Sequence, residues 1–352
     1  MHTKKWRMTL AIGLAVSLTS LAACATPGGG GGDTDSDGGV EARTIGWVDG
    51  VLAGSYQQRL QEVAGEAVDH LGWEMQTIDL AGDPSKANSA VSSLVASGVD
   101  AILMSAVTPS TARAGLLQAQ AAGIPVLIVG SEPGEQELVD ELGLAYFGES
   151  EAGLSLPLIE LMKEQLSGED EVGVLYTTAL ASSTIRTDTV VEELTDAGIT
   201  VIPPVETGFD FADGQANAAA LINQHPNMKT IVSIYDLWTA ATVAAIKASG
   251  RDIKVYSFYA DAVNNPLMRD NPEIVLGLAD GDMISSPLVA IDRLLAHFEN
   301  DTEIDASSVE YTYVAVLPDT LPPGEQNGPV SYEEALDPFF TSWEKDYGVA
   351  AK

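Results

Sequence analysis

Residues 101–129, AILMSAVTPSTARAGLLQAQAAGIPVLIV, contain the pattern that decides the fold. The apolar runs at 101–105 and 126–129 have the length and composition of buried strands. Between them, a helix is expected at 109–122, with Pro109 as its first residue. A strand, a helix and a second apolar strand form a βαβ unit, in which the strands are parallel and covered by helices. This stretch therefore predicts an α/β fold.

The same alternation of strand and helix extends in both directions along the chain. Upstream, strands are expected at 44–48 and 74–80, with a helix at 56–71 between them. Downstream, the pattern predicts strands at 172–176, 200–205, 230–235 and 254–258 and helices at 184–197, 212–224 and 237–249. Two series of βαβ units predict two parallel sheets, each covered by helices on both faces.

Length and charge restrict the possible functions. The chain has 352 residues, which suits two lobes of ordinary domain size. Its 17 Lys and Arg residues are outnumbered by 51 Asp and Glu residues, so the formal net charge is −34. Such a charge repels phosphate backbones, and nucleic acid is excluded as a partner. The histidines show no metal-ligand spacing, so we expect neither a metal nor a cofactor.

The N-terminus has the features of an export signal. Basic residues precede an apolar run at 10–18, which is short for a membrane span. The following residues at 21–24, LAAC, resemble the lipobox of bacterial lipoproteins. This resemblance implies a signal peptide at 1–23 and a lipid on Cys24, which would anchor the protein to the outer face of the cell membrane. An ordinary signal peptide with a chance cysteine is the alternative.

Residues 24–42 are expected to form a flexible tether because they are rich in Gly and Asp. Asp33 to Gly38 partly match a calcium-binding loop, but Thr44 stands where that loop requires Glu, so we interpret the segment as a spacer. Cys24 is the only cysteine, which excludes disulfides and thiol catalysis in the mature chain.

Several separate segments together resemble a known family. They are DPSK at 83–86, GVDAI at 98–102, AGIPV at 122–126, Arg186 twelve residues before Gly198, and Asp236 fourteen residues before Gly250. In this order and spacing, the sequence resembles the type I periplasmic solute-binding proteins of sugar ABC transporters, in particular the ribose-binding group. The resemblance implies two Rossmann-like αβα lobes with parallel sheets, joined by three crossover strands, with a ligand cleft between the lobes.

The resemblance also implies a domain arrangement and a function. Lobe 1 is expected at 43–149 plus 280–305, and lobe 2 at 150–279 plus 306–352, with hinge segments near 149–153 and 279–282. The expected protein is a monomeric, extracytoplasmic binding protein. It would capture a small molecule, a sugar, polyol or sugar derivative, and deliver it to the permease of an ABC transporter.

Candidate ligand-binding residues follow the predicted strands, because ligands of open parallel sheets bind beyond the carboxyl ends of the strands. The candidates are Tyr56, Gln57, Ser105, Arg186, Phe209, Tyr235, Asp236, Tyr259 and Asp261. The resemblance implies that Tyr56 and Phe209 stack on a sugar ring and that Arg186 donates hydrogen bonds to it. Each also has a structural alternative: core packing for the two rings, a surface ion pair for Arg186 and a helix N-cap for Asp236.

Other positions depart from the pattern of the ribose-binding group. Gly, Ser, Tyr or Ala replaces its polar ligand-binding residues at Gly54, Ser105, Gly130, Tyr235, Tyr259 and Ala279. These replacements predict a wider, more aromatic cleft than a ribose site, suited to a larger or less hydroxylated ligand.

Enzymes are disfavoured because the sequence lacks the P-loop, the dinucleotide-binding fingerprint and a complete nucleophile elbow. Two alternatives to sugar transport stay open. One is a binding lipoprotein for a non-sugar metabolite, aromatic or otherwise. The other is a protein that presents its ligand to a membrane sensor.

Overall fold

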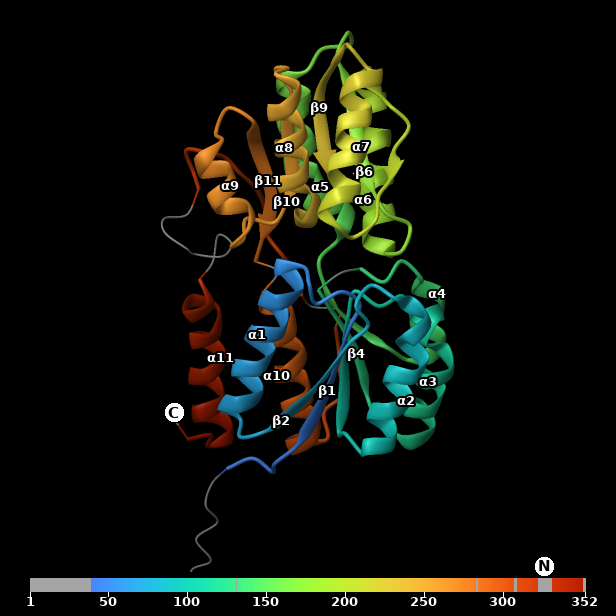
Figure 1. The fold of residues 1–352 in the computed structure, drawn as a ribbon. Helices are drawn as coiled ribbons and strands as arrows, with labels where there is room; N and C mark the ends of the chain where they lie inside the picture. The colour runs from blue at the N-terminus through green and yellow to red at the C-terminus, as the bar shows by residue number, and fades with distance from the viewer. Residues whose placement is uncertain (1–38, 131, 283, 307–308, 322–330, 351–352) are drawn as a thin grey trace, which may run out of the picture. The chain divides into compact units, whose positions relative to one another are not determined.

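The computed structural model describes residues 39–130, 132–282, 284–306, 309–321 and 331–350. The predicted signal peptide, Cys24 and most of the predicted tether therefore lie outside the described residues. The described chain forms two α/β lobes, as the sequence predicts (Figure 1). Within these residues, no helix combines the length and apolar character needed to cross a bilayer.

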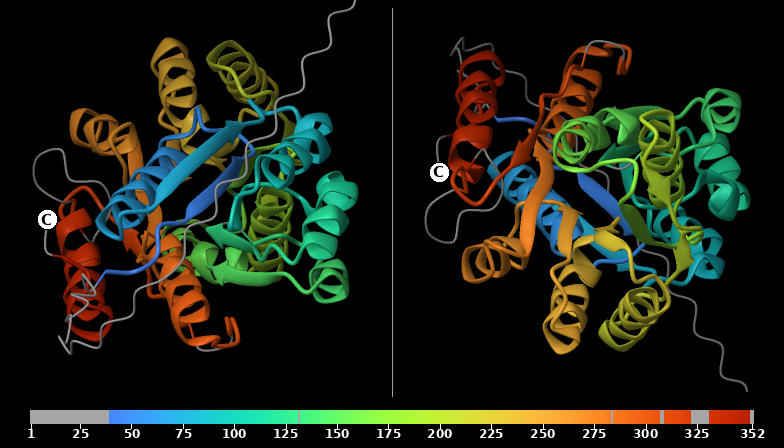
Figure 2. Two further views of the ribbon diagram at one scale, coloured as in Figure 1. Left: turned by 90° about the horizontal axis from the view of Figure 1, so that it is seen from below. Right: turned by 90° about the horizontal axis from the view of Figure 1, so that it is seen from above.

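Lobe 1 is built on a five-stranded parallel sheet in the order β2-β1-β3-β4-β5. Its strands are β1 (Thr44–Asp49), β2 (Glu74–Asp79), β3 (Ala101–Ser105), β4 (Val126–Gly130) and β5 (Ala145–Gly148). Its helices are α1 (Ser55–His70), α2 (Ala87–Ser97), α3 (Pro109–Ala122), α4 (Gln136–Leu142), α10 (Ser285–Asn300) and α11 (Tyr332–Tyr347), with a short 3₁₀ turn at Pro84–Lys86. Helices α1, α10 and α11 lie on one side of the sheet and α2, α3 and α4 on the other (Figures 1 and 2).

The alternation of side chains along the strands explains this layering. Leu103 of β3 joins the apolar cluster under α1 and α10, whereas Ile102 and Met104 join the cluster under α2 and α3. Both faces of the sheet are thus apolar, as expected of a parallel sheet. Helix α3 has the bounds predicted for it, 109–122. Gly123 ends the helix with a φ of +72°, a conformation that glycine adopts without steric cost.

Lobe 2 is built on a seven-stranded sheet in the order β12-β11-β10-β9-β6-β7, with β8 also paired to β6. Its strands are β6 (Glu171–Tyr176), β7 (Thr200–Val201), β8 (Val205–Glu206), β9 (Met228–Ser233), β10 (Lys254–Phe258), β11 (Val275–Gly281) and β12 (Tyr313–Val316). Its helices are α5 (Glu151–Gln165), α6 (Ala181–Asp196), α7 (Phe211–Gln224), α8 (Thr239–Ser249) and α9 (Asn264–Asp270), with a 3₁₀ turn at Asp236–Trp238. Only β12 is antiparallel to its neighbour among these pairs.

The predicted strand at 200–205 is interrupted. Pro203 and Pro204 separate β7 from β8, and both short strands pair with β6. Proline has no backbone N–H to donate to a neighbouring strand, so two consecutive prolines break the hydrogen-bond ladder.

The C-terminal segment differs from the expected domain arrangement. Strand β12 belongs to lobe 2, as expected, but α11 packs against α1 and α10 of lobe 1. Trp343 of α11 is fully buried and donates a hydrogen bond from Nε1 to Asp292 of α10, at 2.9 Å. Residues 332–347 therefore belong to lobe 1, whereas they were expected in lobe 2. The chain consequently passes between the lobes a fourth time, between β12 and α11, in addition to the three expected crossovers.

Candidate functional site

The carboxyl ends of the strands of both lobes face one another, and several side chains join the two edges. The ring of Tyr56, in the first turn of α1, stacks on the ring of Tyr259, which follows β10, with centroids 3.9 Å apart and planes inclined by 7°. Ser55 of α1 contacts Asp236 and Asp261 of lobe 2. The structure thus places four predicted site residues at one interface between the lobes: Tyr56, Tyr259, Asp236 and Asp261.

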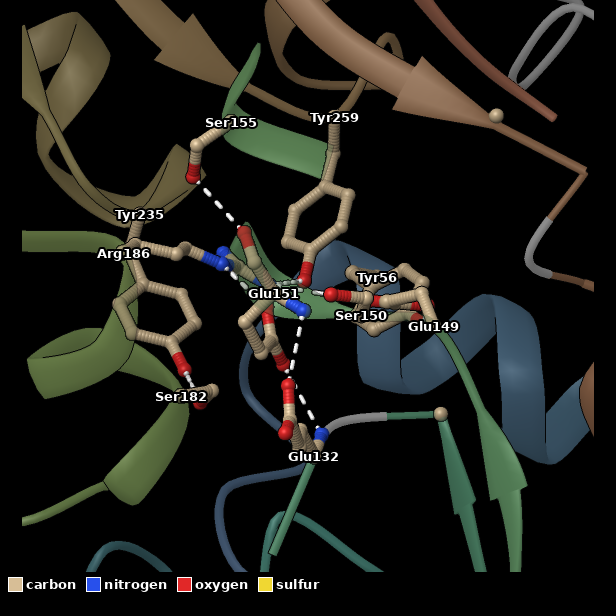
Figure 3. A network of polar contacts seen from close by, with 12 residues as sticks. Tyr56, Glu132, Glu149, Ser150, Glu151, Ser155, Ser182, Arg186, Tyr235 and Tyr259 are labelled. Carbon is tan, nitrogen blue, oxygen red and sulfur yellow. Dashed lines mark hydrogen bonds and ion pairs between the residues drawn. The ribbon is translucent and has the colours of Figure 1, made fainter. Parts of the chain in front are cut away.

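Arg186 lies at the centre of a buried network (Figure 3). Its Nε donates to Glu151 Oε2 at 2.5 Å, its Nη1 donates to the carbonyl of Ile234 at 3.2 Å, and its Nη2 donates to the hydroxyl of Tyr259. Nη2 also lies 3.7 Å from Glu149 Oε1. The guanidinium is therefore held by groups of the protein itself, and the surface ion pair considered as its alternative is wrong.

Three aromatic rings surround the same guanidinium. The Arg186 Cζ atom lies 5.2 Å from the ring centroid of Tyr235, 4.6 Å from that of Phe258 and 4.9 Å from that of Tyr259. At these distances the ring faces attract the cation, and the attraction is stronger in a site without water. The Tyr235 hydroxyl is bonded to Ser182 (Figure 3).

Tyr259 has a backbone conformation that is rare for a bulky residue. Its φ is +69°, in the left-handed region that costs most side chains about 1–3 kcal/mol. Two hydrogen bonds hold the backbone of Tyr259 in this conformation. Its N–H donates to Ala279 O at 2.6 Å, and its carbonyl accepts from Asn264 Nδ2 at 2.9 Å. The surrounding structure thus holds the ring of Tyr259 against Tyr56.

Glu149 and Glu151 are central to the site but were not predicted. The Tyr56 hydroxyl donates to Glu149 Oε2 at 2.9 Å, and both glutamates are fully buried. They flank the first passage between the lobes, directly after β5. The position of Glu149 at the carboxyl end of a strand was the available signal, but β5 is too short and irregular in sequence to be predicted.

A second unpredicted ion pair joins the lobes. Arg59 of α1 lies 3.6 Å from Asp280 of β11, measured from Nη2 to Oδ1, and its Nη1 donates to the carbonyl of Ala260 at 3.3 Å. Asp280 also accepts from the amides of Ala260 and Gly281 at 2.6 and 2.8 Å. Arg59 appears in the sequence only as one polar residue on an amphipathic helix, so its burial could not be foreseen.

The remaining predicted residues have different surroundings. Gln57 and Ser105 are buried, and neither Gln57 Nε2 nor Ser105 Oγ has a hydrogen-bond partner among the described residues. Phe209 is half-buried, and a Cβ atom at Gly82 of lobe 1 would lie 3.3 Å from its ring. Phe209 therefore packs across the lobes at the edge of the interface.

Aromatic side chains of the two lobes pack against one another between the lobes, whereas the sequence predicted a wide cleft there. Two cavities of about 10 Å³ lie there, one beside Phe209 and one between Glu132 and Ser182. Each has room for about one water molecule. The aromatic side chains themselves fill the interface, since Tyr259 occupies the face of Tyr56. Larger cavities of about 570 and 500 Å³ lie near Pro125 and Ile304, at the opposite end of β4.

Burial changes the acidity of the carboxyl groups in the interface. It raises the pKa of Glu149 well above its ordinary value, and the charge of Glu151 raises it further. Burial also raises the pKa of Glu151, although Arg186 opposes this effect. The pKa of Asp236 rises to about 6 through burial and through the neighbouring Asp261. Among the described residues, no group of three or more His, Cys, Asp or Glu side chains is arranged to hold a metal.

Comparison with known proteins identifies the family. Residues 45–271 match the family model described as periplasmic binding protein domain, which is more than half of the chain. The chain therefore belongs to this family of extracytoplasmic binding proteins. The family and the fold class inferred from the sequence are both confirmed.

Relatives share the sequence weakly and the fold closely. The chain is 24% identical over 247 residues to the ribose import binding protein of Bacillus subtilis strain 168, covering 70% of this chain and 79% of that protein. Its fold is similar to a solute-binding protein of Agrobacterium vitis with bound allitol, with a TM-score of 0.68, 20% identity and coverage of 80% and 97% of the two chains. It is also similar to a carbohydrate transporter of Acidothermus cellulolyticus 11B in complex with myo-inositol, with a TM-score of 0.69, 17% identity and coverage of 80% and 96%.

Proposed function

We propose that this protein captures a small sugar, polyol or sugar derivative between its lobes and delivers it to the permease of an ABC transporter. One observation carries this proposal. The carboxyl ends of the strands of both lobes face one another at a buried interface that contains Tyr56, Arg186 and Asp236. In open α/β sheets this edge is where ligands bind. Proteins of similar fold are described with bound allitol and myo-inositol, which supports a polyhydroxylated ligand.

The proposed binding step is a closure of the two lobes around the ligand. Contacts made to both lobes stabilise the closed form alone, so the ligand shifts the equilibrium toward it. In the proposed complex the ligand takes the face of Tyr56 that Tyr259 now covers. Gln57 Nε2 and Ser105 Oγ, which have no partner among the described residues, supply hydrogen bonds to it. Binding involves no cofactor and no chemical turnover.

Attachment of the protein to the membrane through a lipid on Cys24 is part of the same proposal. It rests on the sequence LAAC at 21–24. A diacyl lipid provides the two hydrocarbon chains that durable anchoring requires. The protein is proposed to act as a monomer with one ligand site per chain.

A binding screen tests the function. Purified protein is titrated by calorimetry and thermal shift with ribose, allose, allitol, myo-inositol, glycosides and aromatic acids. We expect one site per chain, filled by a sugar or polyol, with weaker binding in Gln57→Ala and unchanged binding in Gln118→Ala, an exposed control on α3. Binding of an aromatic acid without any sugar or polyol would instead support the alternative of a non-sugar ligand, which the rings of Tyr56, Tyr235 and Tyr259 favour.

A further inference from the structure

Buried charge is concentrated at the interface between the lobes, and it is unbalanced. The buried Asp, Glu, Lys and Arg side chains of the described chain are six acids and two arginines: Asp49, Glu149, Glu151, Asp236, Asp261, Asp280, Arg59 and Arg186. Seven of them take part in the contacts at the interface between the lobes, and the eighth, Asp49, is the last residue of β1. Burying a charge without a partner is costly, so this excess of carboxyl groups must be offset by protons or by a cation.

The two arginines are already engaged. Arg186 is paired with Glu151 and lies near Glu149, and Arg59 is paired with Asp280. The positive charge of Arg59 also interacts with Asp261 beyond ion-pair distance, but Arg59 forms its ion pair with Asp280. No basic side chain among the described residues lies within ion-pair distance of Asp236 or Asp261. Among the six buried acids, Asp49, Asp236 and Asp261 therefore have no ion-pair partner in the described chain, and of these Asp236 and Asp261 contact a residue of the other lobe, Ser55.

Asp236 and Asp261 converge on a single hydroxyl group. Ser55 Oγ lies 2.7 Å from Asp236 Oδ2 and is also bonded to Asp261 Oδ2. A serine hydroxyl has one proton, so it can donate to only one of two ionised carboxylates. The second contact requires a proton on one of the carboxyl groups. The raised pKa of Asp236 agrees with this requirement.

Other groups at this place reduce the negative charge only in part. The Ser55 amide donates to Asp236 Oδ2 at 3.1 Å, and the N-terminus of α1 contributes about half a positive charge. Asp261 Oδ1 accepts from the amides of Val263 and Asn264 at 3.0 and 2.7 Å. Asp236 Oδ1, however, is buried and makes no hydrogen bond of ordinary geometry in the described chain, although the backbone N–H of Leu237 lowers the pKa of Asp236.

A separate polar group beside this pair also lacks a partner. Gln57 is 1% exposed, and its Nε2 atom makes no hydrogen bond among the described residues. Its Oε1 atom lies against Gly54, next to Ser55, at 2.8 Å from where a Cβ of Gly54 would stand. The site therefore combines a donor suited to a ligand hydroxyl with two carboxyl groups suited to a positively charged nitrogen.

We propose that the ligand carries a protonated nitrogen, as amino sugars and amino alditols do, and that this nitrogen binds to Asp236 and Asp261 beside Ser55. The proposal rests on the function proposed above and defines its ligand class more narrowly. A cationic nitrogen offsets the excess negative charge directly, whereas with a neutral sugar the pair has to keep its one proton. The ammonium group takes the place of the proton that the pair holds in the ligand-free closed form.

Matched pairs of compounds test this inference. The mature protein is titrated near pH 6, where the Asp236 carboxyl group is partly protonated, with D-glucose and D-glucosamine, D-galactose and D-galactosamine, and D-glucitol and 1-amino-1-deoxy-D-glucitol. We expect the amino compound of a binding pair to bind at least about tenfold more tightly, since charge-assisted hydrogen bonds are roughly twice as strong as neutral ones. Calorimetry in buffers of different ionisation enthalpy should show proton release when the amino compound binds.

Two variants separate the site from a general effect of charge. Asp236→Asn is expected to remove most of the preference for the amino compound. Asp252→Asn changes a lobe 2 aspartate that is exposed and paired with Lys254, and it should leave the preference intact. Proton release is measured on the unmodified protein, so that readout stands even if Asp236→Asn fails to fold.

The possible outcomes distinguish this inference from the proposed function. If neutral compounds bind as tightly as their amino partners, with no proton release, the cationic ligand is wrong and sugar or polyol binding stands. If no compound of either kind binds while a sugar or polyol of the functional screen does, the cationic ligand is contradicted and the function stands. If nothing in either set binds, the sugar or polyol function is contradicted together with the inference.

Discussion

Tyr56 of lobe 1 and Tyr259 of lobe 2 stack face to face across the interface between the lobes, with ring centroids 3.9 Å apart. The hydroxyl of Tyr56 donates to Glu149, and the hydroxyl of Tyr259 accepts from Arg186, so both rings are tied to one polar network. A change in the relative position of the lobes that separates the two rings would therefore also disturb the hydrogen bonds of Glu149 and Arg186.

Tyr259 is expected to stabilise the closed arrangement of the lobes in the absence of ligand. Tyr259→Ala removes the stacking contact, which for aromatic pairs contributes about 0.5–1.5 kcal/mol beyond area burial. We expect the ratio of open to closed molecules to rise roughly two- to tenfold. Spin labels at Gln118→Cys and Asn223→Cys, in a Cys24→Ser background, report the distance between exposed sites on α3 and α7.

The matched control keeps the ring. Tyr259→Phe should retain most of the closed population, and Tyr256→Phe, which removes a hydroxyl bonded to Gln165 within lobe 2, should leave it unchanged. Identical distance distributions for Tyr259→Ala and the parent protein would show that the stack does not hold the lobes.

Arg186 is expected to be essential for stability because its removal leaves two buried carboxylates without a cation. Arg186→Met should lower the free energy of unfolding by about 3–5 kcal/mol. Arg113→Met, which removes an exposed ion pair with Glu141, should change it by less than about 1 kcal/mol. Adding Glu151→Gln to Arg186→Met should restore part of the loss in urea denaturation. A double variant less stable than the single one would contradict the charge-pair explanation.

Asp49 is expected to make the protein more stable as the pH falls from about 8 to about 5. Burial raises its pKa to about 7 in the folded chain, against about 3.9 in an unfolded one. The folded state thus binds more protons between these values, and its stability decreases as the pH rises through them. Ionising Asp49 in the folded state costs on the order of 4 kcal/mol.

Thermal unfolding at several pH values measures this effect. Asp49→Asn should flatten the pH profile, because the variant has no carboxyl group to titrate at this position. Asp252→Asn should leave the profile unchanged, since Lys254 lowers the pKa of Asp252 and its titration lies outside this range. A parent protein whose stability increases from pH 5 to pH 8 would refute the prediction.

Trp343 is expected to attach the C-terminal helix to lobe 1. Its side chain is fully buried, and truncation of such a tryptophan costs about 3–5 kcal/mol. Trp343→Ala should therefore lower the denaturation midpoint strongly, and Trp343→Phe should do so less. Phe211→Ala, at a ring that is 51% exposed, is the control and should have little effect. Comparable losses in Trp343→Ala and Phe211→Ala would contradict the packing of α11 described here.

Cys24 is expected to anchor the protein to the membrane. Cys24→Ala removes the only cysteine and hence the proposed site of lipidation. Cell fractionation should then find the variant in the soluble extracytoplasmic fraction, whereas the parent protein sediments with membranes. Equal membrane association of both proteins would show that the anchor lies elsewhere.

Local patterns in the sequence were sufficient to determine the α/β lobes. The apolar strands and the Pro109-to-Gly123 helix depend on spacing and capping within about thirty residues, and the structure places that βαβ unit as predicted. Because parallel strands end at the same edge of a sheet, the sequence also predicted Tyr56, Asp236, Tyr259 and Asp261 as site residues. The structure places these four residues at one interface.

Only the tertiary structure decided which of these groups contact one another. The pairing of Arg186 with Glu151, and of Arg59 with Asp280, joins residues 35 and more positions apart, and nothing in the local sequence marks them as buried. The stack of Tyr259 on Tyr56 narrows a cleft that the sequence predicted to be wide. Helix α11 packs on lobe 1 because its apolar face contacts α1 and α10. Those two helices form one surface only in the folded lobe, so the local sequence of α11 does not indicate its partner.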